Sequence, residues 1–324
     1  VYGALSGLVG AFDAPYSVFL PPSDAKKFEE DIKGVFGGIG AEIGIRSSQL
    51  VVVAPLKATP AERAGLKPKD KILKVDDKFT ADLTLDEAIK LIRGEPNTEV
   101  VLTILRDEWT EPKEIPITRQ VIKAPTLDLE MKEGNIAHFK LYNFNQNASF
   151  LFYEKALSAL VGGARGVVLD LRNNPGGYLE VAVNLAGWFM DRGDTVVIEK
   201  FKSGEERNFR ANGNSAFANF PVAVLINGGS ASASEILAGA IKMNKNAKLI
   251  GEKTFGKGTV QELNTLKDGS EIKVSIAEWL LPNRDQIDKK GIAPDIEIKM
   301  PEKETENKDP QLEKAIEILK EMMN

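Results

Sequence analysis

Residues 222–261 read VAVLINGGSASASEILAGAIKMNKNAKLIGEKTFGKGTVQ, and the rest of the chain is interpreted from this stretch. Its first five residues are continuously apolar, which is typical of a buried strand. Asn-Gly-Gly at 227–229 ends the strand, serines follow at 230, 232 and 234, and an Ala-rich helical pattern continues from Ile236. The order predicts a serine hydroxyl near a helix N-terminus, where free N–H groups and the helix dipole favour negative charge.

Two interpretations of the serines are open at this point. Ser232 and Glu235 have the spacing of a capping box, in which the serine begins the helix and does nothing else. A nucleophilic serine instead needs a base. The chain has one histidine, His138, and no cysteine. The remaining common arrangement pairs the serine with a lysine.

Lys257 is the candidate base. It lies in Phe255-Gly256-Lys257-Gly258, where two glycines let the backbone approach another segment closely. A lysine acts as a base only when neutral, so its usual pKa of about 10.4 has to fall by roughly two to three units. Burial among apolar groups lowers a lysine pKa in this way. The alternative is an ordinary solvated loop lysine.

SASASEILAGA followed by GEKTFGKGTVQ resembles the core signature of the carboxy-terminal processing peptidases, also called tail-specific proteases. The resemblance implies a serine endopeptidase with a Ser-Lys dyad. It implies Ser232 as nucleophile, Lys257 as base and Gln261 as the residue that assists the lysine. The residues alone do not choose among the three serines; the choice of Ser232 comes from the resemblance. The implied fold is mixed α/β, with a crotonase/ClpP-like catalytic core, an inserted PDZ domain and helical terminal segments.

Size and composition are those of a globular protein. The chain has 324 residues, 27% of them charged and 43% hydrophobic, which is enough for two domains with their own cores. The net charge of −5 argues against a nucleic-acid partner. No metal-ligand cluster or phosphate-binding loop is evident, so no cofactor is expected. The apolar start, VYGALSGLVGAF, reads as the middle of a helix, and with the absence of cysteine we expect an extracytoplasmic (periplasmic or cell-envelope) protein whose signal or anchor precedes this chain.

Residues 37–108 resemble a PDZ domain. The order strand, helix, strand, helix, strand and the PAERAGL…DKIL pattern carry this resemblance. PDZ domains bind the C-terminus of an extended peptide as an added strand. The resemblance places the carboxylate-binding loop at Gly38, Ile39 and Gly40, although a Gly-rich entry is also compatible with an ordinary tight turn. Arg93, at the end of the second helix of this domain, is the candidate regulatory residue that reaches Gln261; the alternative is a solvated arginine interacting with the helix dipole.

Residues 135–300 form the expected catalytic core, after an N-terminal helical segment (1–36) and a linker strand (109–134). DLRNNPGG at 170–177 follows a buried strand. The amide of Gly176 or Gly177, together with that of Ala233, is the expected oxyanion donor, because glycine amides approach a carbonyl without an interfering Cβ. The alternative is a plain helix-entry turn. Asp170 and Arg172 are expected to fix this loop.

The final segment, 301–324, predicts an amphipathic helix. The resemblance implies homo-oligomers formed through the terminal helices; the alternative is packing of this helix on its own domain. Expected partners are protein or peptide substrates held by their C-terminal tails, and an adaptor or regulatory protein. Two other functions remain open: a catalytically silent or autoinhibited PDZ scaffold, and a crotonase-like enzyme acting on acyl-coenzyme A.

Overall fold

The computed structural model describes residues 1–12, 14, 16–46, 49–245, 247–301 and 308–323. The chain forms two compact units. One contains Val1–Lys33 and Pro125–Asn324, and the other is Gly34–Ala124. The second unit interrupts the first in sequence, so the expected insertion of one domain into another is confirmed. In the described ranges no helix has the length and apolar character needed to cross a membrane.

The larger unit is built on a six-stranded sheet of order β10-β11-β12-β15-β16-β19. β10 and β11 are antiparallel, and the following pairs are parallel. Its strands are β10 (Leu127–Lys132), β11 (Ile136–Leu141), β12 (Gly166–Asp170), β15 (Val222–Ile226), β16 (Lys248–Gly251) and β19 (Ile296–Glu297). Every residue of β12 and of β15 is buried, as expected for parallel strands covered on both faces.

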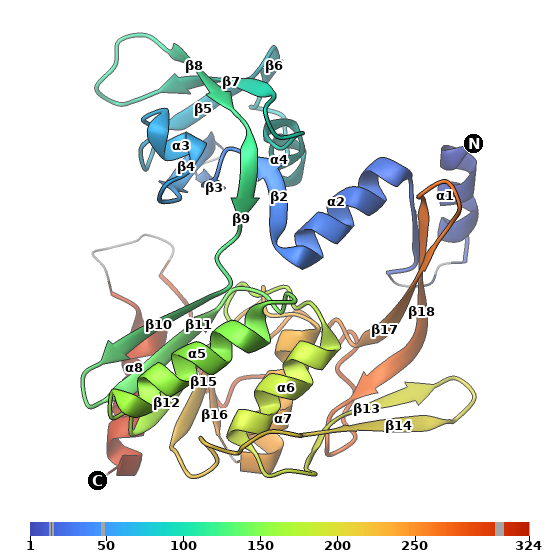
Figure 1. Cartoon of the computed structure of the whole chain (residues 1–324), viewed down its shortest axis with the longest axis vertical. Helices are drawn as coiled ribbons and strands as arrows, with labels where there is room; N and C mark the ends of the chain where they lie inside the picture. Colours follow the sequence, from blue (N-terminus) through green and yellow to red (C-terminus); the bar gives the residue numbers. More distant parts are fainter. Residues whose placement is uncertain (13, 15, 47–48, 246, 302–307, 324) are drawn as a thin grey trace. The chain divides into compact units, whose positions relative to one another are not determined.

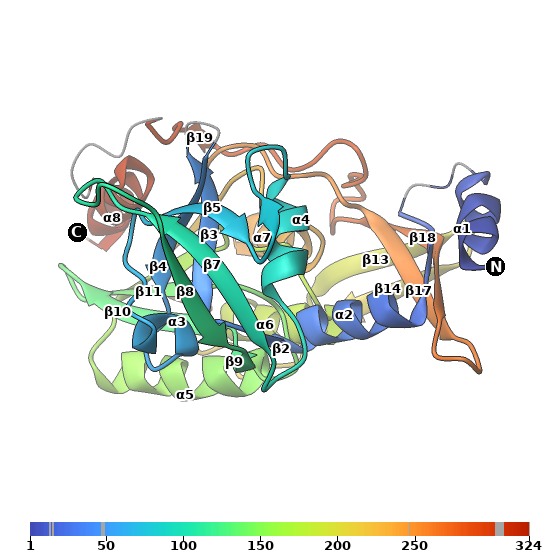
Figure 2. The ribbon, with the colours of Figure 1, turned by 90° about the horizontal axis from the view of Figure 1, so that it is seen from above.

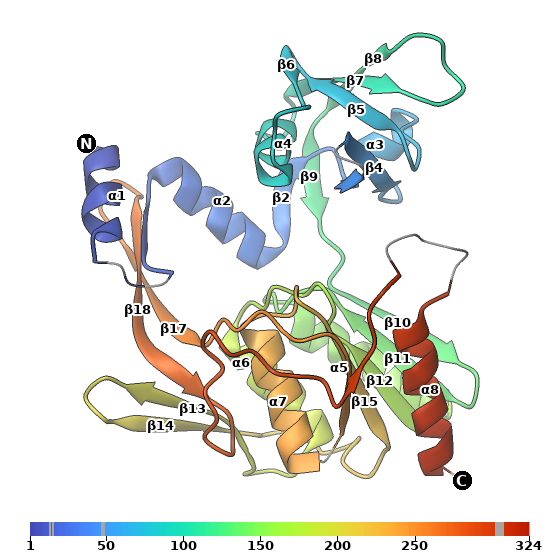
Figure 3. The ribbon, with the colours of Figure 1, turned by 180° about the vertical axis from the view of Figure 1, so that it is seen from behind.

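Helices cover both faces of this sheet. One face packs against α5 (Ala148–Val161), α6 (Leu179–Phe189) and α7 (Ala233–Lys245), whose buried side chains share one core with Phe139, Leu169 and Val224 (Figure 1). The other face carries α8 (Pro310–Met323), which buries Ala315 and Leu319 (Figure 3). The C-terminal helix therefore packs on its own domain, which was the alternative to an oligomer contact. Residues 302–307, in the segment expected to form this helix, lie outside the described ranges.

A second sheet of the same unit carries the hairpin that follows the candidate base. Its path is β1-β18-β13-β14, with β17 also paired to β18. The strands are β1 (Val18–Leu20), β13 (Thr195–Phe201), β14 (Glu206–Arg210), β17 (Thr259–Thr265) and β18 (Glu271–Leu280). Helix α1 (Tyr2–Gly10) lies beside the β17–β18 hairpin (Figure 2), and the Tyr2 hydroxyl donates to Asp268 in its turn; α2 (Pro22–Lys33) follows β1. The N-terminal segment 1–36 was expected to be helical with breaks at its prolines, and the strand β1 between the two helices was not expected.

The smaller unit has the PDZ order of elements. Its main sheet runs β3-β4-β5-β7-β8, with β6 paired to β5, and a separate pair joins β2 and β9. The elements are β2 (Val35–Gly38), β3 (Ala41–Arg46), β4 (Gln49–Pro55), α3 (Pro60–Arg63), β5 (Lys71–Val75), β6 (Lys78–Phe79), α4 (Leu85–Ile92), β7 (Glu99–Leu105), β8 (Lys113–Thr118) and β9 (Gln120–Lys123). β8 pairs with β7 and β9 with β2, so most of the expected linker strand 109–134 belongs to this unit, and only β10 belongs to the core.

Candidate active site

Three loops meet at one edge of the core sheet. β12, β15 and β16 are adjacent and parallel, so their carboxyl ends reach the same edge. The loops that leave them are NNPGG (173–177), NGGSAS (227–232) and EKTFGKG (252–258). Binding sites of open α/β sheets form outside the carboxyl ends of the strands. The topology thus brings together the segments that the sequence singled out.

The three serines have different environments. The Ser230 hydroxyl donates to Leu171 O at 2.8 Å, and the Ser234 hydroxyl donates to Asn174 O at 2.9 Å. Both side chains are fully buried. Ser232 is partly exposed, and its hydroxyl has no hydrogen-bond partner among the described residues. Two serines therefore hold the loops together, and Ser232 alone presents an unengaged hydroxyl.

Ser232 lies at a strained turn directly before α7. Its φ is +55°, in the left-handed region that residues other than glycine rarely occupy. A Cβ on Gly176 would lie 2.9 Å from Ser232 Cβ and 3.0 Å from Ala233 N. Gly176, with φ +100°, therefore has to be glycine so that the NNPGG loop can pass against Ser232. A serine held on a sharp strand-to-helix turn is the geometry of an exposed nucleophile.

The backbone amides around Ser232 divide into engaged and open groups. Gly176 N–H donates to Asn174 Oδ1 at 2.9 Å, so of the two glycine amides considered as oxyanion donors this one already has an internal acceptor. Among described residues, the amides of Gly177 and Ala233 have no acceptor. Ala233 is also the first residue of α7, where the helix dipole favours an anion. These two amides are the ones available to a developing negative charge.

Glu235 connects the serine turn to the lysine loop. Its carboxylate is fully buried, and Oε2 accepts hydrogen bonds from the amides of Ser232 and Lys257, each at 2.9 Å. Oε1 accepts from the Thr254 hydroxyl at 2.5 Å and from Gly256 N at 2.8 Å. Because one oxygen binds both amides, the backbones of Ser232 and Lys257 are fixed close together. The capping-box interpretation captured only the first of these four contacts.

We expect Glu235→Gln to lower the free energy of unfolding by about 1–3 kcal/mol, because the amide nitrogen would face N–H donors and leave at least one buried group unpaired. Urea unfolding at neutral pH measures this change. Glu180→Gln is the matched control, since Glu180 is exposed in the first turn of α6. Equal stability of the two variants would contradict the connecting role of Glu235.

Lys257 lies in a mostly desolvated position. Burial lowers the pKa of its ammonium, and the Glu235 carboxylate opposes that shift. Its Nζ lies 5.7 Å from the centroid of the Tyr16 ring, and in the described part of the chain it forms no ion pair or hydrogen bond. Burial, followed by Asp288 and Glu235, raises the pKa of Tyr16. Tyr16 is a site residue that the sequence analysis missed, and its distance of 241 positions from Lys257 leaves no local signal.

The two side chains of the expected dyad, Ser232 and Lys257, are not hydrogen-bonded to each other. Within the described ranges, no hydrogen bond joins Lys257 Nζ to Ser232 Oγ, and the Gln261 amide donates to Thr259 Oγ1 at 3.1 Å rather than contacting the lysine. Catalytic hydrogen bonds are often long in unliganded enzymes and tighten when substrate binds. Glu235 thus brings the backbones of Ser232 and Lys257 together, and no direct bond between their side chains is formed among the described residues.

Arg172 anchors the strand that leads into the NNPGG loop. Its guanidinium binds both oxygens of Asp170, at 2.9 and 2.6 Å, and both oxygens of Asp309, at 2.9 and 2.7 Å. Asp309 also accepts from the Leu312 amide at the start of α8. Asp170 and Arg172 thus fix the end of β12, just before the loop, and the contact extends to the C-terminal helix.

This anchor predicts acid sensitivity. Burial alone would raise the pKa of Asp170, but hydrogen bonds from His138 and Arg172, with the Arg172 charge, lower it to about 2 from 3.8. A carboxyl group whose pKa is lower in the folded state stabilises the fold at pH values above its unfolded-state pKa. This stability is lost as the pH falls through its folded-state pKa. We expect Asp170→Asn to be less stable than the parent by about 2 kcal/mol or more at pH 6, with the gap narrowing toward pH 2. Urea titrations at several pH values measure it, and a gap independent of pH would contradict it.

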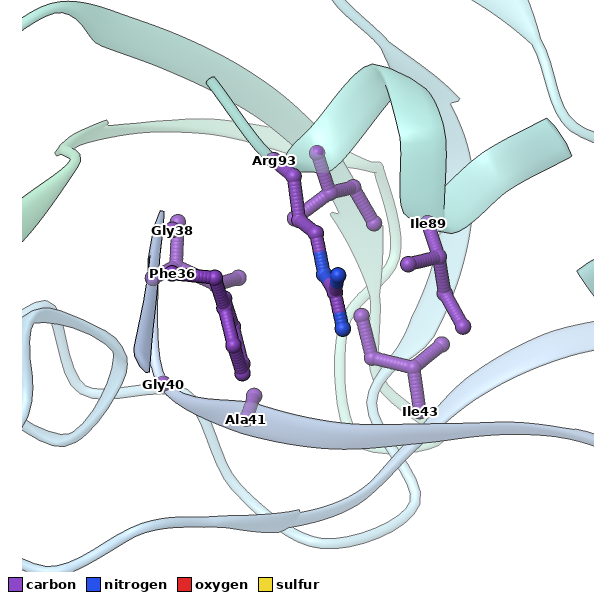
Figure 4. Close-up of a pocket in the computed structure, with 9 residues that line it drawn as sticks. Phe36, Gly38, Gly40, Ala41, Ile43, Ile89 and Arg93 are labelled. Carbon is purple, nitrogen blue, oxygen red and sulfur yellow. The ribbon is translucent and has the colours of Figure 1, made fainter. Parts of the chain in front are cut away.

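The smaller unit contains a pocket at the predicted carboxylate-binding loop. Gly38, Ile39 and Gly40 line it, together with apolar side chains of β3 and α4 and with Arg93 (Figure 4). The Arg93 guanidinium lies over the Phe36 ring, 3.9 Å from its centroid. Gly40 has φ +75°, and a Cβ there would meet Thr59. The pocket is a groove between a strand and a helix, which is the form that binds an extended peptide.

Comparison with known proteins agrees with both units. The model of peptidase family S41 matches residues 135–298, which is half of the chain, and a PDZ-domain model matches residues 51–106. The chain belongs to peptidase family S41. The S41 region contains all three loops at the sheet edge, and the PDZ region contains β4 to β7.

Similar S41 proteins extend the match to nearly the whole chain. The carboxy-terminal processing protease CtpA of Bacillus subtilis (strain 168) is 37% identical over 302 residues, covering 93% of this chain and 64% of that protein. A probable CtpA-like serine protease of Staphylococcus aureus (strain N315) is 41% identical over 305 residues, covering 94% and 61%. The chain thus spans less than two thirds of these relatives.

Two solved structures have a fold similar to that of this chain. The photosystem II D1 C-terminal processing protease is 30% identical, with a TM-score of 0.63 over 92% of this chain and 81% of that chain. An S41 protease of Bacteroides fragilis has a TM-score of 0.64 at 16% identity, covering 97% of this chain and 88% of that one. The second likeness concerns the fold alone.

Proposed function

We propose that this S41 chain is a serine endopeptidase that cuts proteins near their C-termini, with Ser232 as nucleophile and Lys257 as base. The observation that carries the proposal is the contrast among the serines: two hydroxyls are buried and bonded, and the third is unengaged, on a left-handed turn at a helix N-terminus. The names of two similar processing proteases support the same substrate class.

The proposed reaction uses groups already at the sheet edge. Neutral Lys257 takes the proton of the Ser232 hydroxyl as Oγ attacks the substrate carbonyl carbon. The carbonyl oxygen becomes an oxyanion that accepts from the amides of Gly177 and Ala233. The C–N bond then breaks, and the Lys257 ammonium gives its proton to the leaving amine. Water, deprotonated by Lys257, hydrolyses the ester on Ser232. Gln261 would orient the lysine after turning away from Thr259.

Casein, which is unfolded, is the substrate for the first test. The purified chain should produce new peptide termini that mass spectrometry identifies. An acyl-coenzyme A hydrolase would instead release free coenzyme A and leave casein intact. If casein stays intact, we would add peptides with free C-termini, because the missing bond between Ser232 and Lys257 is compatible with an autoinhibited resting state. Failure under both conditions would favour the scaffold.

We further propose that the PDZ pocket captures the substrate tail. The pocket is apolar on one side and bounded by backbone at Gly38, Ile39 and Gly40, so an apolar C-terminal residue with a free carboxylate fits its chemistry. Amidating the C-terminus of such a peptide removes the charge and an acceptor oxygen, and should weaken binding about tenfold or more. Calorimetry with the acid and amide forms of one peptide measures the difference.

Arg93 is the proposed link between tail binding and the dyad. Its side chain crosses the pocket beside Phe36 (Figure 4), so a bound tail would compete with that stacking and free the guanidinium for the proposed interaction with Gln261. We expect Arg93→Ala to reduce casein cleavage several-fold, whereas Lys90→Ala, on an exposed position of the same helix, leaves it unchanged. Unchanged cleavage by Arg93→Ala would remove the gating role.

Two broader expectations remain proposals. An oligomer would use α1, which has no buried residue and exposes Leu8, rather than the face of α8 that is already buried. An extracytoplasmic location is supported by the absence of cysteine. Analytical ultracentrifugation with and without residues 1–12 tests the first proposal, and fractionation of producing cells tests the second.

A further inference from the structure

Tyr16 presents its ring to the candidate base. Lys257 Nζ lies over this ring, 5.7 Å from its centroid, and in the described part of the chain it has no hydrogen bond or ion pair. The Tyr16 side chain is partly buried, and its hydroxyl likewise has no hydrogen-bond partner among the described residues. The contact between the two residues is therefore one of ring and ammonium, not a hydrogen bond.

The backbone of Tyr16 is held in an unusual conformation. Its φ is +65°, in the left-handed region that a bulky residue adopts only when the surrounding structure imposes it. Glycine or asparagine would occupy this position more readily. The turn itself does not need tyrosine, so the reason for an aromatic ring here lies in what the ring contacts.

The next residue, Ser17, fixes the position of this turn. Its N–H donates to Ala14 O at 3.0 Å, which closes the turn around Tyr16. Its hydroxyl accepts from Ser275 N–H at 3.0 Å, and Ser275 lies opposite Gln261 in the β17–β18 pair. The turn is therefore tied to the hairpin that directly follows the lysine loop, so the ring and the lysine share one scaffold.

We propose that Tyr16 is a positioning residue for the base: its ring occupies space beside Lys257 Nζ that water would otherwise fill, and so favours the neutral amine. The proposal rests on the proposed function of Lys257. An aromatic face also attracts an ammonium, but 5.7 Å is near the outer limit of about 6 Å for this attraction, so the exclusion of water is the larger effect. Burial is also the main cause of the lowered pKa of Lys257.

The charged groups around this contact stay in place when the ring is changed. Glu235 of α7 favours the protonated form of Lys257, and the charge of Asp288, whose backbone lies against Gly258, acts on Tyr16. The other charged residues of the neighbouring elements are Lys273 and Glu278 of β18 and, beside Gly256, Lys289 and Lys290. A variant of Tyr16 alone therefore tests the ring against a constant set of charges.

Competitive labelling with trace acetic anhydride measures the titration of Lys257 without relying on catalysis. Only neutral amines react, so the pH dependence of Lys257 acetylation, measured by mass spectrometry, reports this titration. Tyr16→Asn and Tyr16→Gly remove the ring and suit the left-handed backbone, and we expect each to move the titration upward by about half to one pH unit. Tyr16→Phe keeps the ring and should leave the titration in place. Phe12→Asn, which removes an exposed ring from the same segment, is the matched control.

Casein cleavage by the same variants gives the second readout. For Tyr16→Asn, kcat/KM should fall about three- to tenfold on the acid side of its pH profile and match the parent at alkaline pH, whereas Tyr16→Phe should match the parent throughout. An unshifted Lys257 titration in folded Tyr16→Asn and Tyr16→Gly, or an equal shift in Tyr16→Phe or Phe12→Asn, would overturn the role of the ring and leave the peptidase proposal intact. A parent chain that cuts neither casein nor tail peptides, although Tyr16→Asn shifts the titration, would instead count against the peptidase proposal.

Discussion

Ser232→Ala is expected to abolish casein cleavage, with kcat falling on the order of 10⁴- to 10⁶-fold. The reason is chemical: Oγ is the only protein atom that the proposed mechanism bonds to the substrate carbon. Folding should be unaffected, because the Ser232 hydroxyl forms no hydrogen bond with described residues. Alanine at φ +55° is strained, as serine is, so the thermal midpoint should stay within a few degrees of the parent.

The neighbouring serines provide the matched controls. Ser230→Ala and Ser234→Ala each remove a buried hydroxyl and leave a backbone carbonyl without its donor, so each should lower the free energy of unfolding by about 1–3 kcal/mol. Both should still cleave casein. Ser232→Ala should therefore lose activity and keep its stability, whereas the other two variants should lose stability and keep their activity. Cleavage that survives Ser232→Ala, or disappears in Ser234→Ala while the protein remains folded, would show that the wrong serine carries the chemistry.

The sequence predicted the sheet edge well because its signals are local. The apolar run before Asn227 is continuous, the one before Arg172 is interrupted by Asp170, and both are short and followed by turn residues, so both strands and the loops that leave them could be read directly. Parallel neighbours then place these loops at one edge whatever the rest of the chain does. The order of elements in the PDZ unit was predictable for the same reason.

What the sequence did not provide depends on contacts between distant residues. The resemblance pointed to Ser232, but the physical difference among the serines depends on Ser230 reaching Leu171 and Ser234 reaching Asn174, 59 and 60 positions away. Tyr16 approaches Lys257 because the three-residue strand β1 pairs with β18, and so short a strand has no periodicity to detect. β8 was expected in a linker because its pairing with β7 is also non-local.

Glu235 shows how one residue can satisfy two interpretations. The spacing from Ser232 predicted a helix cap, and the Ser232 amide does bind its carboxylate. The same carboxylate also holds the amides of Gly256 and Lys257, a contact that spacing within the helix cannot reveal. Glu235 therefore caps the helix and also holds the lysine loop, and only the folded structure reveals the second role.

Lys257→Met is expected to lower kcat/KM on the order of 10⁴-fold, because it removes the proposed base and leaves the nucleophile with no proton acceptor. Lys257→Arg should be equally inactive, although it keeps the positive charge, because a guanidinium is not deprotonated in proteins. This pair of variants distinguishes a base from a cation that merely stabilises negative charge. Substantial activity in Lys257→Arg would exclude the base role.

Replacing Lys257 is expected to raise stability although it removes activity. Burial lowers the pKa of Lys257 in the folded chain, so below its usual value the unfolded chain binds more protons at this position. Stability from this group therefore rises with pH between the lowered folded pKa and about 10.5, and is reduced at lower pH. Lys257→Met removes the cost of a buried ammonium, so at pH 7 it should unfold at higher urea than the parent while being inactive. A less stable Lys257→Met would mean that the ammonium has a stabilising partner, and the lysine would then be held protonated, which a general base cannot be.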